Sequence, residues 1–187
     1  MILTPILTLA AFVAAPSGAA ALERDVSQAA LERDVSQAAL ELCFRAESGD
    51  LNLAGGSALG ATGFARAPAA VEDSAAAATP GRGRPIVVRK GMGDDLVVLL
   101  FWPQAHVCNV TFGGSQSDKA MDALRTQVEN SDSSFQRDSA RTKDNASVKI
   151  ETFTSKQEGS PLTMMLVTPK IAQPSIRHSV LVLFQGK

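Results

Sequence analysis

The spacing of apolar positions changes along the chain from a helical period to a two-residue period. Between residues 31 and 46 the apolar side chains recur every three or four positions, which predicts one amphipathic helix. Gly49 follows and fits the C-terminal end of this helix. The apolar stripe consists of Leu31, Val35, Ala39, Leu42, Cys43 and Ala46.

Farther along, short runs of apolar and β-branched residues predict strands. Residues 95–102 are nearly all apolar, so this strand is expected to be central and covered on both faces. Residues 106–112 alternate instead and place His106 and Cys108 on one face of a strand. The expected strands are 86–89, 95–102, 106–112, 147–154, 162–168 and 175–184.

A second helix is expected between these groups of strands, capped by Ser115 or Ser117 and ending near residue 130. Its inward side chains are Met121, Leu124 and Val128. The order helix, strands, helix, strands predicts an α+β domain with an antiparallel sheet of five or six strands, on which both helices pack.

A tandem repeat precedes the helical stripe, because the nine residues ALERDVSQA occur twice in a row over 21–38. Nine residues rotate a helix by about 180°, so the two copies turn their Leu and Val to opposite sides. The copy that holds Leu31 and Val35 is expected to pack, and the copy with Leu22 and Val26 to form an extension with few contacts.

Two segments after the helix have weaker signals for regular secondary structure. Residues 51–61 suggest a second short helix, although their glycines make it marginal. Residues 65–85 are rich in Ala, Pro and Gly and hold almost no large apolar group, which predicts a mobile loop.

The N-terminus has the pattern of a secretory signal peptide over 1–21: an uncharged apolar run that ends at small residues. Residues 22–187 then form a single domain. Export places the chain in the periplasm or outside the cell, with no stable membrane span after cleavage. The only two cysteines, Cys43 and Cys108, are expected to form a disulfide there, and a link of this length stabilises a fold by about 4 kcal/mol.

Charge and aromatic content argue against nucleic acid as a partner. The formal net charge is −1, the chain has no Tyr, and Trp102 is its only Trp. Nucleic-acid binding normally relies on a basic surface and on several rings for stacking, and both are missing here.

The chain also resembles small exported bacterial proteins of uncharacterised function. The shared pattern is a signal peptide, a helix that ends in Cys43, a segment that runs into Gly63 and Phe64, and the strand motif Cys-x-Val at Cys108. The resemblance covers most of the mature chain and implies a disulfide-linked α+β domain. It implies no activity.

Candidate chemistry is sparse. His106 and a reduced Cys108 would supply two metal ligands, but the sequence offers no third or fourth ligand pattern, so neither a metal nor a cofactor is expected. No catalytic residue can be named, although His106 and His178 are the best general-base candidates.

The sequence therefore favours a non-enzymatic accessory or interaction module with a possible protein partner. Two alternatives stay open: a hydrolase-like enzyme that uses His106 or His178, and a carrier of a small apolar ligand. An enzyme should hold its histidine near a carboxylate and a hydroxyl, and an interaction module should expose an apolar patch or an open sheet edge.

Overall fold

The computed structural model describes residues 18–131, 135–155, 162–171 and 177–185, with side chains from Ser27 onward and Asp94 excepted. It is an α+β fold with one nine-stranded antiparallel sheet, which confirms the predicted class. The helical elements are α1 (Gly18–Ser36), η1 (Gln37–Leu42), α2 (Cys43–Ser48), α3 (Ser57–Gly60), α4 (Ala69–Ala78), η2 (Gly93–Asp95), η3 (Pro103–Ala105) and α5 (Ser117–Asn130). The strands are β1 (Ala65–Arg66), β2 (Ile86–Lys90), β3 (Val97–Trp102), β4 (Val107–Phe112), β5 (Phe135–Arg137), β6 (Lys143–Asp144), β7 (Val148–Ser155), β8 (Leu162–Pro169) and β9 (His178–Phe184).

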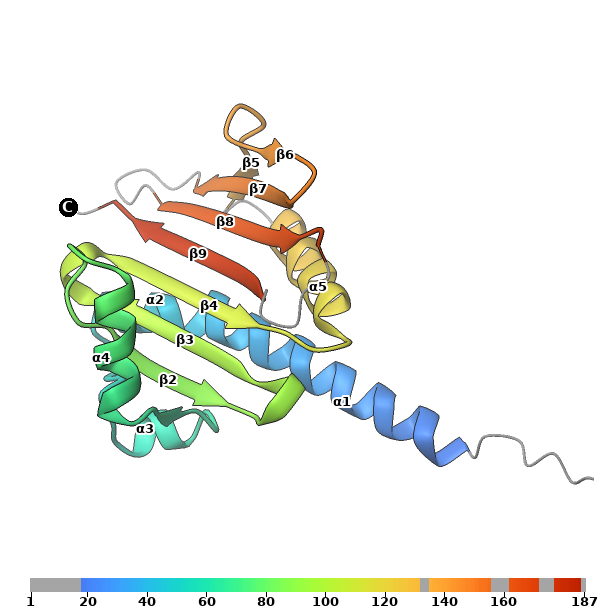
Figure 1. The fold of residues 1–187 in the computed structure, drawn as a ribbon, viewed down its shortest axis with the longest axis horizontal. Helices are drawn as coiled ribbons and strands as arrows, with labels where there is room; N and C mark the ends of the chain where they lie inside the picture. Colours follow the sequence, from blue (N-terminus) through green and yellow to red (C-terminus); the bar gives the residue numbers. More distant parts are fainter. Residues whose placement is uncertain (1–17, 132–134, 156–161, 172–176, 186–187) are drawn as a thin grey trace, which may run out of the picture.

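Two similar halves build the sheet. Strands β2, β3 and β4 form one meander and β7, β8 and β9 form another, and each meander follows a helix in the chain. The order β1-β2-β3-β4-β9-β8-β7-β5, with β6 also paired to β7, joins the halves between β4 and β9. Helices α1, α2 and α5 lie behind the sheet in Figure 1, so one face of the sheet carries these helices.

The N-terminal helical stripe forms as predicted. Helix α1 continues through the π-helical turn η1 into α2, and Gly49 ends it in the left-handed conformation with a φ of 83°. Leu31 and Val35 of the second repeat copy are buried, which confirms that this copy packs. Figure 1 shows the start of α1 projecting past the sheet. The side chains of Leu22 and Val26 lie outside the described ones.

The main core lies between these helices and the sheet. Met121, Leu124 and Val128 of α5 are fully buried, as predicted. Across the sheet, the register aligns Leu99, Val110, Val180 and Leu166 in one row of buried side chains. Successive side chains of a strand alternate between the two faces of a sheet. The residues of this row, and every second residue from them along each strand, therefore face the helices.

The expected loop at residues 65–85 is wrong, because the segment forms β1 and the ten-residue helix α4. Alanine has the highest helix propensity, and α4 gains a tertiary anchor in Glu72, which is 1% exposed. Both arginines that bind this carboxylate, Arg66 and Arg84, belong to the same segment. The mobility of the segment stays a prediction.

Two further expectations need correction. The sheet has nine strands rather than five or six, because β1, β5 and β6 are two or three residues long and too short to give an alternating pattern. The short helix expected at 51–61 shrinks to α3, although Leu51, Leu53 and Leu59 are buried.

Candidate interaction surface

The predicted disulfide is present and ties the N-terminal helix to the middle of the sheet. Cys43 and Cys108 are bonded, with their Cα atoms 5.8 Å apart and 65 positions between them in the chain. Both are fully buried. A hydrogen bond joins the same helix to the turn that precedes β4, since Glu47 Oε1 lies 2.7 Å from His106 Nδ1.

The expectation that His106 lies on a strand with Cys108 is wrong. His106 occupies a left-handed turn with a φ of 53°, and β4 begins only at Val107. Cys108 is oxidised and therefore offers no thiolate to a metal. Within the described residues, no group of three or more His, Cys, Asp or Glu side chains is placed to hold a metal ion.

The two histidines do not meet. Phe112, at the far end of β4, pairs with His178, so β4 separates the histidines by about 20 Å. His178 Nε2 lies 2.9 Å from Asp118 Oδ1, and its ring stacks on Phe112. Each histidine thus has a carboxylate partner, but in the described part of the chain neither imidazole is hydrogen-bonded to a hydroxyl or thiol.

A buried carboxylate that the sequence did not predict anchors α4. Arg66 donates two hydrogen bonds to Glu72, with Nε–Oε1 at 2.9 Å and Nη2–Oε2 at 3.1 Å. Arg84 Nε lies 3.4 Å from Oε2, and the Val87 N–H donates to Oε1. These donors, Arg66 foremost, lower the pKa of Glu72 from its ordinary value of 4.5, although burial opposes them.

This lowered pKa predicts a pH-dependent contribution to stability. A carboxylate with a depressed folded-state pKa stabilises the fold above its ordinary pKa, and the contribution is lost as the pH falls through the folded-state pKa. We therefore expect wild type to be more stable than Glu72→Gln at pH 7 and the gap to narrow as the pH falls well below 4.5. Urea unfolding at several pH values measures this gap.

Asp73→Asn is the control, because Asp73 is 66% exposed beside the same Arg84. A difference in stability between wild type and Glu72→Gln that stays the same at every pH would contradict the prediction.

The face of the sheet that points away from α1, α2 and α5 carries an unusual set of side chains. We call it the open face and define it by ten half-buried outward positions on five adjacent strands. They are Val98, Leu100, Asn109, Thr111, Ser179, Leu181, Leu183, Met165, Val167 and Ile150. None of these ten is charged, and most are apolar, whereas the outer face of such a sheet is usually polar.

Helix α4 covers only one end of this face. Val87 and Trp102 share the outward side with Leu100 and are 1% and 2% exposed, yet both lie outside the main core. The guanidinium of Arg82 lies 5.7 Å from the centroid of the Trp102 ring. The expectation that β3 is covered on both faces is therefore wrong over much of the strand, because Val98 and Leu100 stay half-buried.

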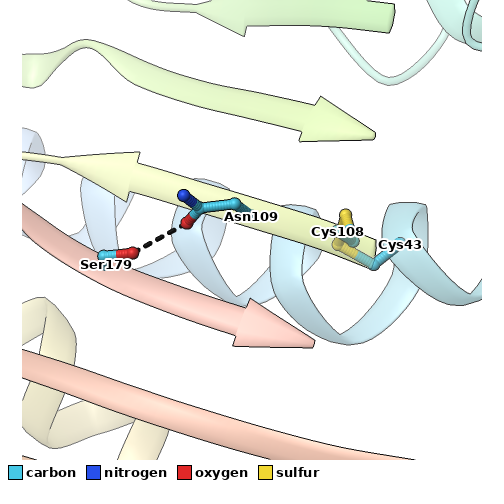
Figure 2. Close-up of a disulfide and its surroundings, with 4 residues drawn as sticks. All are labelled: Cys43, Cys108, Asn109 and Ser179. Carbon is cyan, nitrogen blue, oxygen red and sulfur yellow. Dashed lines mark hydrogen bonds between the residues drawn. A yellow bond between two sulfur atoms is a disulfide. The ribbon is translucent and has the colours of Figure 1, made fainter. Parts of the chain in front are cut away.

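A polar pair occupies the middle of the open face. Ser179 Oγ donates a 2.7 Å hydrogen bond to Asn109 Oδ1, which links β9 to β4. Figure 2 shows this bond beside the Cys43–Cys108 disulfide, which attaches β4 to the helix. The disulfide and the helices thus support one side of β4, and the other side presents Asn109 to solvent.

The sequence carries a pattern for this surface in two of its later strands. Residues 180–184 are apolar without alternation, and so are 164–167. Such runs indicate that both faces of a strand are apolar. The pattern does not predict whether the face of the sheet opposite the helices is covered by another part of the same chain.

Comparisons with protein-family models, with curated proteins and with solved structures found no match to this chain. In the ranges that the structure describes, no helix is long and apolar enough to cross a membrane. The fold and the surfaces above are therefore the observations from which a function can be inferred.

Proposed function

We propose that the protein is an exported, non-enzymatic module that binds another protein through the open face of its sheet. The observation that carries this proposal is the apolar character of outward positions such as Leu100, Leu181 and Met165. An apolar sheet face is normally buried against a second layer. Contiguous apolar patches on a soluble protein commonly mark sites of protein interaction.

The open face fits this role better than the sheet edges do. Strand β1 at one edge has two residues and β5 at the other has three, and each includes an arginine, Arg66 or Arg137. Short, charged edge strands discourage the addition of a further strand. A partner that packs on the face meets no such obstacle.

Two observations support export. The first 21 residues have the composition of a signal peptide, of which residues 1–17 lie outside the described residues. Cys43 and Cys108 form a buried disulfide, and such bonds persist mainly in oxidising compartments.

Affinity capture from the cell envelope of the source organism tests the proposal. We expect the C-terminally tagged wild-type chain to recover a specific protein. Leu181→Glu places a charge on the open face and should reduce that recovery at least tenfold, which corresponds to about 1.4 kcal/mol. The intact mass of the captured chain should lack about 21 residues if the signal peptide is removed.

The matched control is Met92→Glu, because Met92 is 88% exposed in the turn before β3 and lies off the open face. This variant should recover the partner as wild type does. Equal recovery by a folded Leu181→Glu variant would contradict the proposed surface. Recovery of the chain with a bound small molecule and no protein would favour the apolar-ligand carrier instead.

A further inference from the structure

We infer that the partner for the open face is a protein whose contact surface has an apolar centre bordered by aspartate and glutamate side chains. This inference rests on the proposed function, because it names the chemistry of the partner at the same surface. Four cations border the open face and have no carboxylate partner among the described residues. These rim cations are Arg82, Arg89, Lys143 and Arg177.

Arg89 and Lys143 lie on the outward side of the sheet, one near each end of the open face. Arg89 of β2 pairs with Val98, and Lys143 of β6 pairs with Ile150, so each cation shares a face with an outward position. Figure 1 shows β2 and β6 near the two ends of the sheet. Both side chains are exposed. The apolar face therefore has a positive charge near each of its ends.

The other two rim cations border the ends of the central strands. Arg177 is two positions before Ser179, so it continues the outward side of β9, and its side chain lies beside Gly113, the residue that follows β4. At the other end of β4, the guanidinium of Arg82 lies over Trp102, which pairs with the first residue of that strand. Both arginines are exposed.

The rim cations have no ion pair with any described carboxylate, whereas most other described lysines and arginines have one. Two acids near the open face are paired with other arginines. Asp73 Oδ1 on α4 lies 3.2 Å from Arg84 Nη2, and Asp138 Oδ2, next to β7, lies 3.4 Å from Arg141 Nε. The positive charge of the rim is therefore left for a partner to neutralise.

A partner with carboxylates around an apolar centre complements this arrangement. Protein interfaces have an apolar core inside a polar rim, and opposite charges across the rim speed association and exclude wrong partners. Arginine, the commonest rim cation here, has a planar guanidinium that binds carboxylates in a bidentate way. The Trp102 ring positions Arg82 by a cation–π contact. Because the net charge of the chain is −1, the positive charge is a property of this face and not of the whole molecule.

Asn109 favours a protein over an anionic membrane as the source of the negative charge. It lies in the middle of the open face, and its Oδ1 accepts the Ser179 hydroxyl. Among the described residues, none accepts a hydrogen bond from its Nδ2. A protein surface offers carbonyl and side-chain oxygens to this donor, whereas acyl chains offer no acceptor and would bury it unsatisfied.

Fluorescence anisotropy with two synthetic amphipathic peptides tests the inference. Both peptides carry the same leucine stripe at helical spacing, flanked by glutamates in one and by lysines in the other. The oxidised wild-type chain should bind the glutamate peptide at least tenfold more tightly than the lysine peptide in about 50 mM NaCl. The difference should shrink in about 500 mM NaCl, because salt screens exposed charges.

Charge reversal on the rim should remove this preference. Arg89→Glu and Lys143→Glu should each weaken binding of the glutamate peptide at least threefold. The matched control is Lys119→Glu, which changes the net charge equally. Lys119 is exposed on α5, on the other side of the sheet, and donates to Gln28 instead of a carboxylate. This variant should bind as wild type does, and Leu181→Glu should weaken binding of both peptides.

Far-UV circular dichroism and the Tm establish that each variant is folded, and Lys143→Glu serves if Arg89→Glu is not. Equal binding of the two peptides, or binding of neither, would overturn the inference. So would folded rim variants that bind the glutamate peptide as Lys119→Glu does. Cosedimentation with vesicles of phosphatidylcholine and phosphatidylglycerol, lost in Arg89→Glu while neither peptide binds, would assign the face to an anionic membrane instead.

The envelope capture separates this inference from the proposed function. If neither peptide binds but recovery of a protein from the envelope still depends on Leu181, the proposed function stands and the acidic-partner inference falls. If the glutamate peptide binds as expected, recovery of the envelope protein should also fall in Arg89→Glu and stay unchanged in Lys119→Glu.

Discussion

Reduction of the Cys43–Cys108 bond is expected to lower the free energy of unfolding by about 4 kcal/mol, because the bond removes loop entropy from the unfolded chain across 65 residues. For a domain of this size the corresponding fall in Tm is roughly 10 °C. The bond also holds α2 on β4, so its loss should loosen the helix relative to the sheet. Urea unfolding of the oxidised and the reduced wild type measures the difference.

The variant Cys43→Ala/Cys108→Ala is the control for this prediction. Both sulfurs are fully buried, so the variant loses packing as well as the cross-link, and its stability should fall at least as far as that of the reduced protein. The reductant should have no further effect on it. A difference below about 1 kcal/mol between oxidised and reduced wild type would show that the cross-link contributes little to this fold.

The variant Glu151→Gln is expected to lower the free energy of unfolding by about 3 kcal/mol, because it removes a buried charge that three cations contact at once. Glu151 is 1% exposed on the helix-facing side of β7. Its carboxylate lies 2.7 Å from Arg125 Nε, 2.7 Å from Arg137 Nη2 and 3.1 Å from Lys149 Nζ. Without its charge, three cations remain close together between α5 and the sheet.

Glu129→Gln is the matched control, since it removes the same charge from the same cluster at an exposed site. Glu129 is 44% exposed and lies 3.9 Å from Arg137, so its loss should cost less than about 1 kcal/mol. Urea unfolding at pH 7 compares the two variants. Equal, small effects would mean that burial does not make the Glu151 contacts stronger than surface ion pairs.

The parts of the fold that the sequence predicted are those with a long, repeated pattern. The stripe from Leu31 to Ala46 and the inward residues of α5 repeat over several turns, so their burial follows from spacing alone. The pairing of Cys43 with Cys108 followed from export and from the presence of only two cysteines. The helical predictions needed only the local spacing, and the disulfide needed only the number of cysteines and the compartment.

The parts that were missed depend on which charged side chains meet and on the conformation of a single turn. Helix α4 is Ala-rich and has few apolar anchors, and its stable position depends on Glu72 meeting Arg66 and Arg84. His106 left the predicted strand because the turn before β4 takes the left-handed conformation. Neither the choice of partner for Glu72 nor the turn conformation can be read from local periodicity.

The open face was visible in the sequence only as an excess of apolar residues. The run around Leu100 was interpreted as a central strand covered on both faces, because that is the usual setting for such runs. The structure shows that α4 covers only the end near Trp102. A second layer supplied by another molecule would satisfy the same pattern.

Methyl NMR of the protein, recorded as the captured partner is added, locates the contact residue by residue. We predict shifts for the outward methyl groups of Leu100, Leu181 and Val167 and none for those of Leu99, which face the helices. Shifts confined to other exposed apolar side chains, such as Val71 or Ile171, with the open-face methyl groups unchanged, would contradict the open face as the interaction surface.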